Sequence, residues 1–349
     1  MISGKIERGL AQRPQPSDDL FRVLADRYGI GNIGETSDLG GSSTLNLLVR
    51  DDEREYVARV YRRWVTTGRL AAMQDARRYL AAAGIPCAVP IPTIDGASWA
   101  AMGDRFIEVE SYVVANGKMD TWERLEAGLP LLGRIHSRLR THQSTAEGRH
   151  APASNSIAPE NLVSGVRKGT QRLRGWEGSA AERELADVAD ALAERVGQAE
   201  RAMPEFPRQL VHGDFWDNNV LHLDEWIVLV ADLDFMGERA RIDDLALTLY
   251  YTNSTFADGQ FSDARLGQLR ALVDVYDSGL DDPLSEFERR AIPLAIVRTA
   301  LGFIAMIAEA DAEAEPETLG RKLAAEMMPD IAWAGGIVDD LDRWQDAMT

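Results

Sequence analysis

The chain has 349 residues and a mass of 38.5 kDa, which is enough for one large domain or two lobes. Hydrophobic residues make up 45% and charged residues 27%, which excludes a collagen, a coiled coil or a disordered chain. No apolar run approaches the ~18 residues of a membrane span, and the N-terminal residues lack the apolar segment of a secretory signal. The single cysteine, Cys87, excludes an internal disulfide, so we expect a cytoplasmic protein.

The negative charge is concentrated in the second part of the chain. Residues 1–200 carry 26 Lys and Arg against 27 Asp and Glu, whereas residues 201–349 carry 12 against 29. So acidic a surface repels phosphate backbones and anionic lipids, which argues against nucleic-acid and membrane partners. It favours either a cationic small molecule as partner or solubility alone.

Short strand-like runs and one helical segment make up residues 1–109. The helical segment, residues 68–83, is rich in Ala, Leu, Met and Arg and is ended by Gly84 and Pro86. The candidate strands are residues 44–49, 56–61, 99–102 and 106–109. These patterns predict a small strand-rich N-terminal lobe, followed by a hinge at residues 110–117.

Helical patterns dominate residues 118–349. We expect helices at residues 122–140 and 180–202 and in the region after about residue 243, with a surface loop at residues 146–156. Three short apolar runs, at residues 209–211, 220–223 and 226–231, predict a small cluster of strands inside this lobe. The sequence therefore predicts an α+β protein with two lobes and a cleft between them.

The stretch from His212 to Val220, HGDFWDNNV, carries the clearest chemical signal. Apolar runs flank it, so it is expected to form a loop between two short strands, and Asp232 ends the next apolar run. Asp214, Asn219 and Asp232 are residue types that orient a hydroxyl group and hold Mg²⁺ near phosphates. Their joint spacing is hard to explain by turn and capping residues alone.

At this point the sequence resembles the aminoglycoside phosphotransferase and choline kinase-like superfamily of small-molecule kinases. HGDFWDNNV, then DLDF at residues 232–235 and DDLA at residues 243–246 carry the resemblance, which spans about residues 30–330 and is most specific at residues 210–246. It implies a bilobal protein-kinase-like fold, in which a small antiparallel-sheet N-lobe binds ATP and a large, mainly helical C-lobe carries catalysis. ATP and Mg²⁺ are the implied cofactors.

The resemblance also implies a role for each matching residue. Asp214 would be the base that accepts the proton of the acceptor hydroxyl, and Asn219 and Asp232 would bind Mg²⁺. Asp234 is a rival for the metal role, although the register from Asp214 favours Asp232. Asp244 would anchor a loop to a helix, and His212 would be structural.

The N-lobe is expected to supply the nucleotide site. Gly41, Ser42 and Ser43 precede a strand and offer backbone N–H groups to phosphates. No lysine lies between residues 6 and 117, so Arg59 is expected to take the place of the strand cation. Glu110 and Tyr112 fit the hinge, whose backbone would pair with adenine.

The helix of the N-lobe departs from the family pattern. The strand cation is usually paired with a glutamate on this helix, and residues 70–84 contain none. Asp75 and Gln74 are the candidate substitutes. The departure leaves room for a catalytically inactive, nucleotide-binding module.

The acceptor remains open between a cationic, aminoglycoside-like antibiotic and a metabolite such as homoserine, choline or a sugar. The segment between Asp232 and Asp244 is too short to bind a peptide, which favours a small molecule. Asp217 and acidic residues of the C-terminal helices, such as Asp281 and Asp282, are expected to line its pocket.

Overall fold

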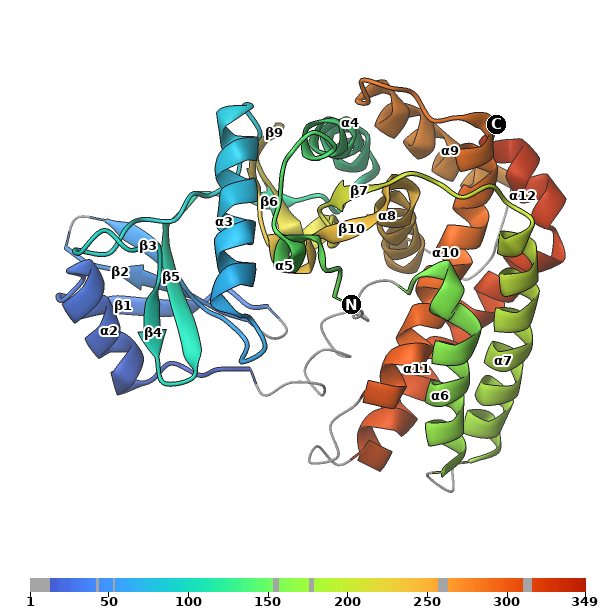
Figure 1. The fold of residues 1–349 in the computed structure, drawn as a ribbon, viewed down its shortest axis with the longest axis horizontal. Coiled ribbons are helices and arrows are strands. Elements are labelled where there is room, and N and C mark those ends of the chain that lie inside the picture. The colour runs from blue at the N-terminus through green and yellow to red at the C-terminus, as the bar shows by residue number, and fades with distance from the viewer. Residues whose placement is uncertain are drawn as a thin grey trace.

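The computed structural model describes residues 13–41, 44–52, 54–152, 157–175, 179–256, 263–309 and 316–349. These residues form a small sheet-based lobe and a larger, mainly helical lobe, seen at the left and right of Figure 1. The predicted two-lobed α+β class is therefore confirmed.

An antiparallel sheet of five strands forms the N-lobe, in the order β1-β2-β3-β5-β4. The strands are β1 (Glu35–Asp38), β2 (Leu45–Arg50), β3 (Glu55–Val60), β4 (Ala100–Met102) and β5 (Arg105–Ser111). Side chains alternate along a strand, so Ala58 and Val60 enter the core of this lobe, where they pack with Leu45 and Ile107. The same alternation sends Arg59 to the opposite face.

Two helices accompany this sheet, whereas the sequence predicted one. Helix α3 (Thr67–Ala82) was expected, and the Thr66 hydroxyl caps its first turn by accepting from a backbone N–H. The missed helix is α2 (Asp18–Tyr28), which Ser17 caps and Gly29 ends with φ of 73°. Its 11 residues present only two fully buried positions, which is too short a pattern to stand out in a sequence.

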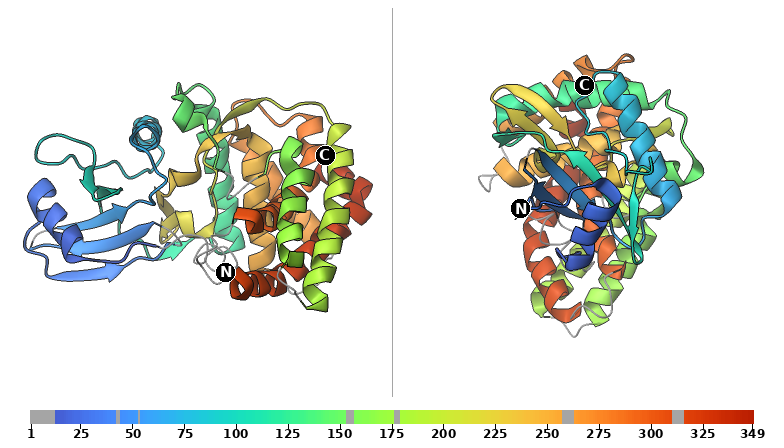
Figure 2. Two further views of the ribbon diagram at one scale, coloured as in Figure 1. Left: turned by 60° about the horizontal axis from the view of Figure 1, so that its bottom comes forward. Right: turned by 90° about the vertical axis from the view of Figure 1, so that its left-hand side faces the viewer.

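The small strands of the C-lobe lie between the N-lobe sheet and the large helices, as Figure 1 and the left view of Figure 2 show. One sheet contains β6 (Gly117–Lys118), β8 (Val220–Leu223) and β9 (Trp226–Val230), and the other pairs β7 (Arg208–Val211) with β10 (Gly237–Ala240). The three predicted strand runs are confirmed, while the short β6 and β10 were not predicted. The Val230 N–H donates to the Pro86 carbonyl at 2.6 Å, which ties this sheet to the end of α3.

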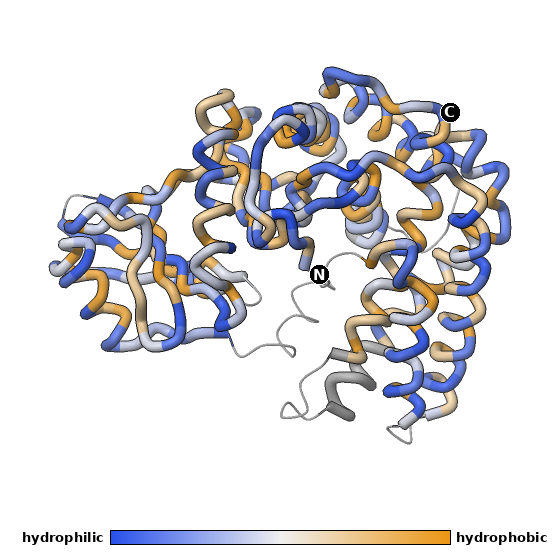
Figure 3. The backbone as a smooth tube through the Cα atoms, viewed as in Figure 1, coloured by the Kyte–Doolittle hydropathy of each residue, from blue (hydrophilic) through white to orange (hydrophobic). Residues whose placement is uncertain are grey.

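Helices build the rest of the C-lobe. They are α4 (Trp122–Leu139), α5 (Ala146–Arg149), α6 (Leu162–Gly175), α7 (Ala180–Arg201), α8 (Arg241–Phe256), α9 (Asp263–Ser278), α10 (Glu286–Met306), α11 (Pro316–Asp339) and α12 (Leu341–Met348). Helix α10 is buried along most of its length because α6, α7, α8, α11 and α12 surround it. Figure 3 shows hydrophobic and hydrophilic residues side by side on the outer helices α6 and α7. No helix of the described residues is long and apolar enough to cross a membrane.

Candidate active site

Asp214 and Asn219 lie together in the loop between β7 and β8. Asp214 is buried, and the Asn219 side-chain N–H₂ donates to both the main-chain oxygen and the Oδ2 of Asp214, each at 2.8 Å. The short helical turn Asp217–Asn219 brings the amide back to the carboxylate. The structure thus unites the predicted base with one predicted metal ligand, and it fixes the carboxylate in one orientation.

His212 supports this loop through both of its ring nitrogens. Nδ1 accepts from the Asp214 N–H at 3.2 Å, so Nε2 carries the proton and donates to the Ala231 carbonyl at 3.0 Å. Burial lowers the pKa of His212, in keeping with a neutral ring. Because both ring nitrogens are hydrogen-bonded, His212 braces the loop, which agrees with the predicted structural role.

Gly213 and Asp244 fix the loop from the other side. Gly213 has φ of +83°, and a Cβ there would lie 2.1 Å from the carbonyl oxygen of Phe235. Its N–H donates to Asp244 Oδ1, and Asp244 Oδ2 contacts His136 Nε2, both at 3.0 Å. Burial opposes ionisation of Asp244, but the hydrogen bond from His136 outweighs it and lowers the pKa. Asp244 therefore anchors the start of α8 to the loop.

Asp232 and Asp234 occupy different environments, although only two residues separate them. The side chain of Asp232 is 24% exposed and that of Asp234 is 4% exposed. Burial and the neighbouring Asp232 raise the pKa of Asp234 to about 6, and Asp234 Oδ2 accepts from the Thr44 hydroxyl at 3.0 Å. Burial opposes ionisation of Asp232 too, but Arg59 and Arg62 outweigh it and lower the pKa. Asp232 is the more accessible and more readily ionised of the two carboxylates.

Arg59 connects the N-lobe sheet to this pair. One of its nitrogens, Nη2, lies 3.2 Å from an oxygen of Asp232 and 3.2 Å from an oxygen of Asp234. The side chain is 6% exposed, and its buried Nε–H has no hydrogen-bond acceptor among the described residues. Such a donor is available to an oxygen atom of a bound molecule. Thr44, which sequence reasoning missed, joins the same pair from the start of β2.

Neither of the candidate helix partners of Arg59 fills that role. Asp75 is exposed and lies 3.4 Å from His142, while the Gln74 side chain donates to Ser98 and Glu108. The carboxylate beside Arg59 comes instead from strand β5, where Glu110 Oε1 lies 3.8 Å from Arg59 Nη1. Glu110 thus reaches the site through its side chain, whereas the sequence assigned it a backbone role in the hinge.

The remaining predicted nucleotide residues lie at the rim of the N-lobe. Strand β5 runs to Ser111, and the Tyr112 N–H donates to the Glu55 carbonyl at 3.0 Å, so the sheet already uses one of the backbone groups expected to pair with adenine. Gly41 lies in the β1–β2 connection with φ of +101°, and a Cβ there would meet Thr44 O at 2.9 Å. Ser42 and Ser43 lie outside the described residues.

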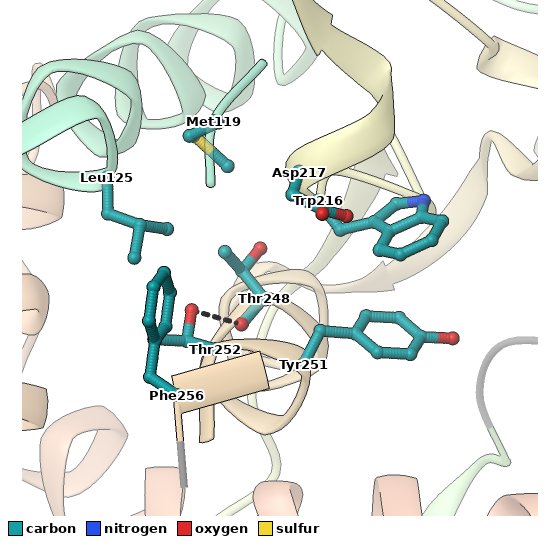
Figure 4. A pocket seen from close by; sticks show the side chains of 8 residues that line it. All are labelled: Met119, Leu125, Trp216, Asp217, Thr248, Tyr251, Thr252 and Phe256. Atoms are coloured by element: carbon teal, nitrogen blue, oxygen red, sulfur yellow. Dashed lines mark hydrogen bonds between the residues drawn. The ribbon is translucent and has the colours of Figure 1, made fainter. Parts of the chain in front are cut away.

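A small hollow opens next to the loop that carries Asp214 and Asn219 (Figure 4). Its walls are aromatic, aliphatic and hydroxyl side chains together with one carboxylate, namely Met119, Leu125, Trp216, Asp217, Thr248, Tyr251, Thr252 and Phe256. Asp217 Oδ2 lies 3.3 Å from Lys118 Nζ, whereas its Oδ1 is buried without a hydrogen-bond partner among the described residues. Asp217, which the sequence analysis predicted as an acceptor ligand, thus lines this hollow.

Asp281 and Asp282 do not line this hollow. The Asp281 N–H donates to the Ser137 hydroxyl at 2.9 Å, and Asp282 pairs with Arg140 near the end of α4. Both are exposed, and the Asp282 carbonyl also accepts from Arg241. The expected acidic wall is therefore reduced, in the described part of the hollow, to Asp217.

A model of the phosphotransferase enzyme family matches residues 36–277. The chain belongs to this family. Among its relatives, the homoserine kinase of Gluconacetobacter diazotrophicus is 24% identical over 292 residues, which are 82% of this chain and 85% of the relative. An uncharacterized protein of Deinococcus radiodurans is 28% identical over 321 residues, covering 86% and 87%. Membership makes this phosphotransferase a kinase of a hydroxyl acceptor, in a family that uses ATP and a divalent metal.

Solved structures confirm the kinase-like fold. A microcompartment-associated aminopropanol kinase superposes with a TM-score of 0.69 at 18% identity, covering 92% of this chain and 97% of that one. An amicoumacin kinase, solved with AMP-PNP, Ca²⁺ and amicoumacin, gives a TM-score of 0.66 at 15% identity, covering 90% of this chain and 94% of that one. The predicted superfamily and bilobal fold are thus confirmed.

Proposed function

We propose that this phosphotransferase transfers the γ-phosphate of ATP to a hydroxyl of a small metabolite, with Asp214 as the base. The Asp214 carboxylate accepts the hydroxyl proton, the hydroxyl oxygen bonds to the γ-phosphorus, and the bond to the β-phosphate oxygen breaks to release ADP. The observation that carries this proposal is the Asn219 amide, which holds the Asp214 carboxylate at 2.8 Å. A base that is already oriented avoids a reorganisation cost during transfer.

Mg²⁺ would bind Asn219 and Asp232. The Asn219 N–H₂ is engaged by Asp214, which leaves its Oδ1 for a metal, and Asp232 is the more accessible carboxylate of its pair. The described residues contain no cluster of three or more His, Cys, Asp or Glu side chains that could hold a metal. Two protein oxygens completed by phosphates suit Mg²⁺, which when bound would neutralise phosphate charge.

The acceptor we propose is a small amino alcohol or hydroxy amino acid with one ammonium group, such as homoserine. Among the described residues, the hollow has one carboxylate oxygen without a hydrogen-bond partner, on Asp217, beside the aromatic rings of Trp216 and Tyr251. A carboxylate and aromatic faces together favour a single cationic group. Relatives named homoserine kinase support this acceptor class.

An aminoglycoside-like antibiotic is the second candidate. The excess of 29 acidic over 12 basic residues in residues 201–349 favours a polycation. Several of these carboxylates are already paired with arginines, among them Asp277 with Arg289 and Asp282 with Arg140. For this reason we rank the antibiotic below the small metabolite.

A panel assay tests the proposal. Purified protein with ATP and Mg²⁺ is offered homoserine, choline, aminopropanol, a neutral sugar and several aminoglycosides, and ADP release and the phosphorylated product are both measured. We expect turnover with a small ammonium-bearing alcohol and none with the sugar. Turnover confined to aminoglycosides would favour the second candidate, and no turnover with any acceptor despite nucleotide binding would favour an inactive, nucleotide-binding module.

A further inference from the structure

A buried cluster of four charged side chains lies behind the nucleotide face of the N-lobe. It comprises Arg59 of β3, Arg77 of α3, and Glu108 and Glu110 of β5. None of the four is more than 6% exposed. Buried charges persist only when each is paired, so the arrangement of the pairs determines where each side chain can lie.

The two glutamates have different partners within this cluster. Glu108 contacts Arg77, Gln74 and the Tyr61 hydroxyl, the last at 3.2 Å, and all of these belong to the interior of the lobe. Glu110 also contacts Arg77, but its Oε1 in addition lies 3.8 Å from Arg59 Nη1. Glu110 is therefore the member that links the cluster to the site.

The guanidinium group of Arg59 is held at both of its ends. Nη1 lies beside Glu110, while Nη2 lies 3.2 Å from Asp232 and 3.2 Å from Asp234. The distance of 3.8 Å is too long for a hydrogen bond but still within the 4 Å range of an ion pair, so the attraction of Glu110 is mainly Coulombic. The two opposing attractions fix the guanidinium between strand β5 and the metal-binding loop.

We propose that Glu110 is the positioning residue for Arg59 and that Arg77 of helix α3 holds Glu110 in place. The helix supplies a cation and the strand supplies the carboxylate, which reverses the polarity that the sequence led us to expect. This explains why residues 70–84 contain no glutamate and yet Arg59 is not left without an anion. The inference rests on the proposed nucleotide site, since its consequence is the placement of Arg59 against phosphates.

Loss of the Glu110 charge would release one side of this balance. Arg59 would then be drawn towards Asp232 and Asp234, where it competes with the metal ion for the same oxygens. The expected result is weaker binding of Mg²⁺-nucleotide, by roughly tenfold, with little change in the affinity for the acceptor. A cluster that only supported the fold would not produce this selectivity.

A thermodynamic cycle on nucleotide binding tests the inference. The dissociation constant of AMP-PNP with Mg²⁺ is measured by calorimetry for the wild type, Glu110→Gln, Arg59→Gln and the double variant. We expect Glu110→Gln to weaken binding roughly tenfold in the wild-type background and less than twofold when Arg59 is already replaced. Equal weakening in both backgrounds, or none in the first, would overturn the positioning role.

Two further variants serve as controls for this test. Glu55→Gln removes a half-buried carboxylate that pairs with Arg50 on the same sheet, and it should leave nucleotide affinity unchanged. Should Glu110→Gln fail to fold by circular dichroism, Glu110→Asp retains the charge, withdraws it from Arg59 and enters the same cycle with the same expected pattern. If the wild type itself binds no nucleotide, the proposed site is contradicted, and this inference with it.

Discussion

The two halves of the active site are built from the sequence in different ways. In the C-lobe, Asp214 and Asn219 are five residues apart and contact each other within one loop. In the N-lobe, Arg59, Arg77 and Glu110 come from two strands and a helix. The first half is encoded locally, whereas the second exists only after the lobe has folded. We therefore expect the C-lobe half to govern the chemical step and the N-lobe half to govern nucleotide affinity.

Removal of the base should give the largest effect. Asp214→Ala is expected to lower kcat by about 10²–10⁴, because a positioned base typically contributes that much. Nucleotide affinity should change little, since the proposed base contacts the acceptor hydroxyl rather than the nucleotide. Steady-state kinetics and calorimetry check the two quantities separately. Near-wild-type turnover would remove Asp214 from the mechanism.

The metal-binding carboxylate should come next. Asp232→Asn is expected to weaken Mg²⁺-dependent nucleotide binding by roughly 10²-fold, because Mg²⁺ prefers a charged oxygen ligand. Asp234→Asn should have the smaller effect on metal dependence, because Asp234 is more buried and is engaged by Thr44 and Arg59. Titration with Mg²⁺ at fixed nucleotide compares the two variants, and the opposite ranking would shift the metal ligand by two residues.

The acceptor carboxylate is expected to affect KM rather than kcat. Asp217→Asn should raise the KM of an ammonium-bearing acceptor about tenfold and leave the KM of ATP unchanged. This pattern is expected when the lost contact binds the acceptor equally in the ground state and the transition state. Asp224→Asn, in the turn between β8 and β9, is a matched control because this exposed carboxylate contacts Asn116 and does not line the hollow. An unchanged acceptor KM in Asp217→Asn would locate the ammonium group elsewhere.

The brace at His212 should appear in the pH dependence of stability. Burial lowers its pKa in the folded protein below the usual value of 6.5, so the unfolded chain binds more protons below that pH. Stability is then lost as the pH falls below about 6.5. In His212→Gln, the loss of melting temperature between pH 7 and pH 5 should be roughly 2–4 °C smaller than in the wild type. An identical loss would mean that His212 does not titrate in this way.

The exposed C-lobe acids should have the smallest effect. Neutralising Asp281 and Asp282 together should change the acceptor KM by less than about twofold, because neither lines the hollow and Asp282 is paired with Arg140. Acceptor kinetics at low and physiological salt measure the effect. A large, salt-dependent rise in KM would restore the acidic wall that the charge distribution suggested.

The sequence could indicate that Asp214 and Asn219 lie together because their contact is short-range. A loop between two strands brings Asp214 to Asn219, and the apolar run before Asp232 forms the next strand, β9. Periodicity likewise predicted most strands and helices, but it missed helix α6, and it predicted a loop at residues 146–149, which form α5. It also missed α2 and the short strands β1, β6 and β10, whose patterns cover too few residues to be distinguished from loops.

The N-lobe half could be predicted only in part. Alternation along β3 correctly indicated that Arg59 lies opposite Ala58 and Val60. The sequence suggested only the helix as the source of the carboxylate that pairs with Arg59, because a sequence does not reveal that Glu110 on β5 lies beside β3. The pairing of Arg59 with Glu108 and of Val57 with Glu110 across the two strands creates that proximity. One signal could have indicated this partner. Glu108 and Glu110 lie on either side of Val109, so two carboxylates share one face of a buried strand.

Transfer of labelled γ-phosphate is the most direct test of the central claim. The wild type, Asp214→Ala and Glu110→Gln are incubated with γ-labelled ATP, Mg²⁺ and homoserine or an amino alcohol, at saturating and at limiting ATP. We expect phosphorylated acceptor from the wild type, almost none from Asp214→Ala at either concentration, and recovery of Glu110→Gln at saturating ATP. Full transfer by Asp214→Ala, or a defect of Glu110→Gln that saturating ATP does not relieve, would contradict the division of labour between the two halves.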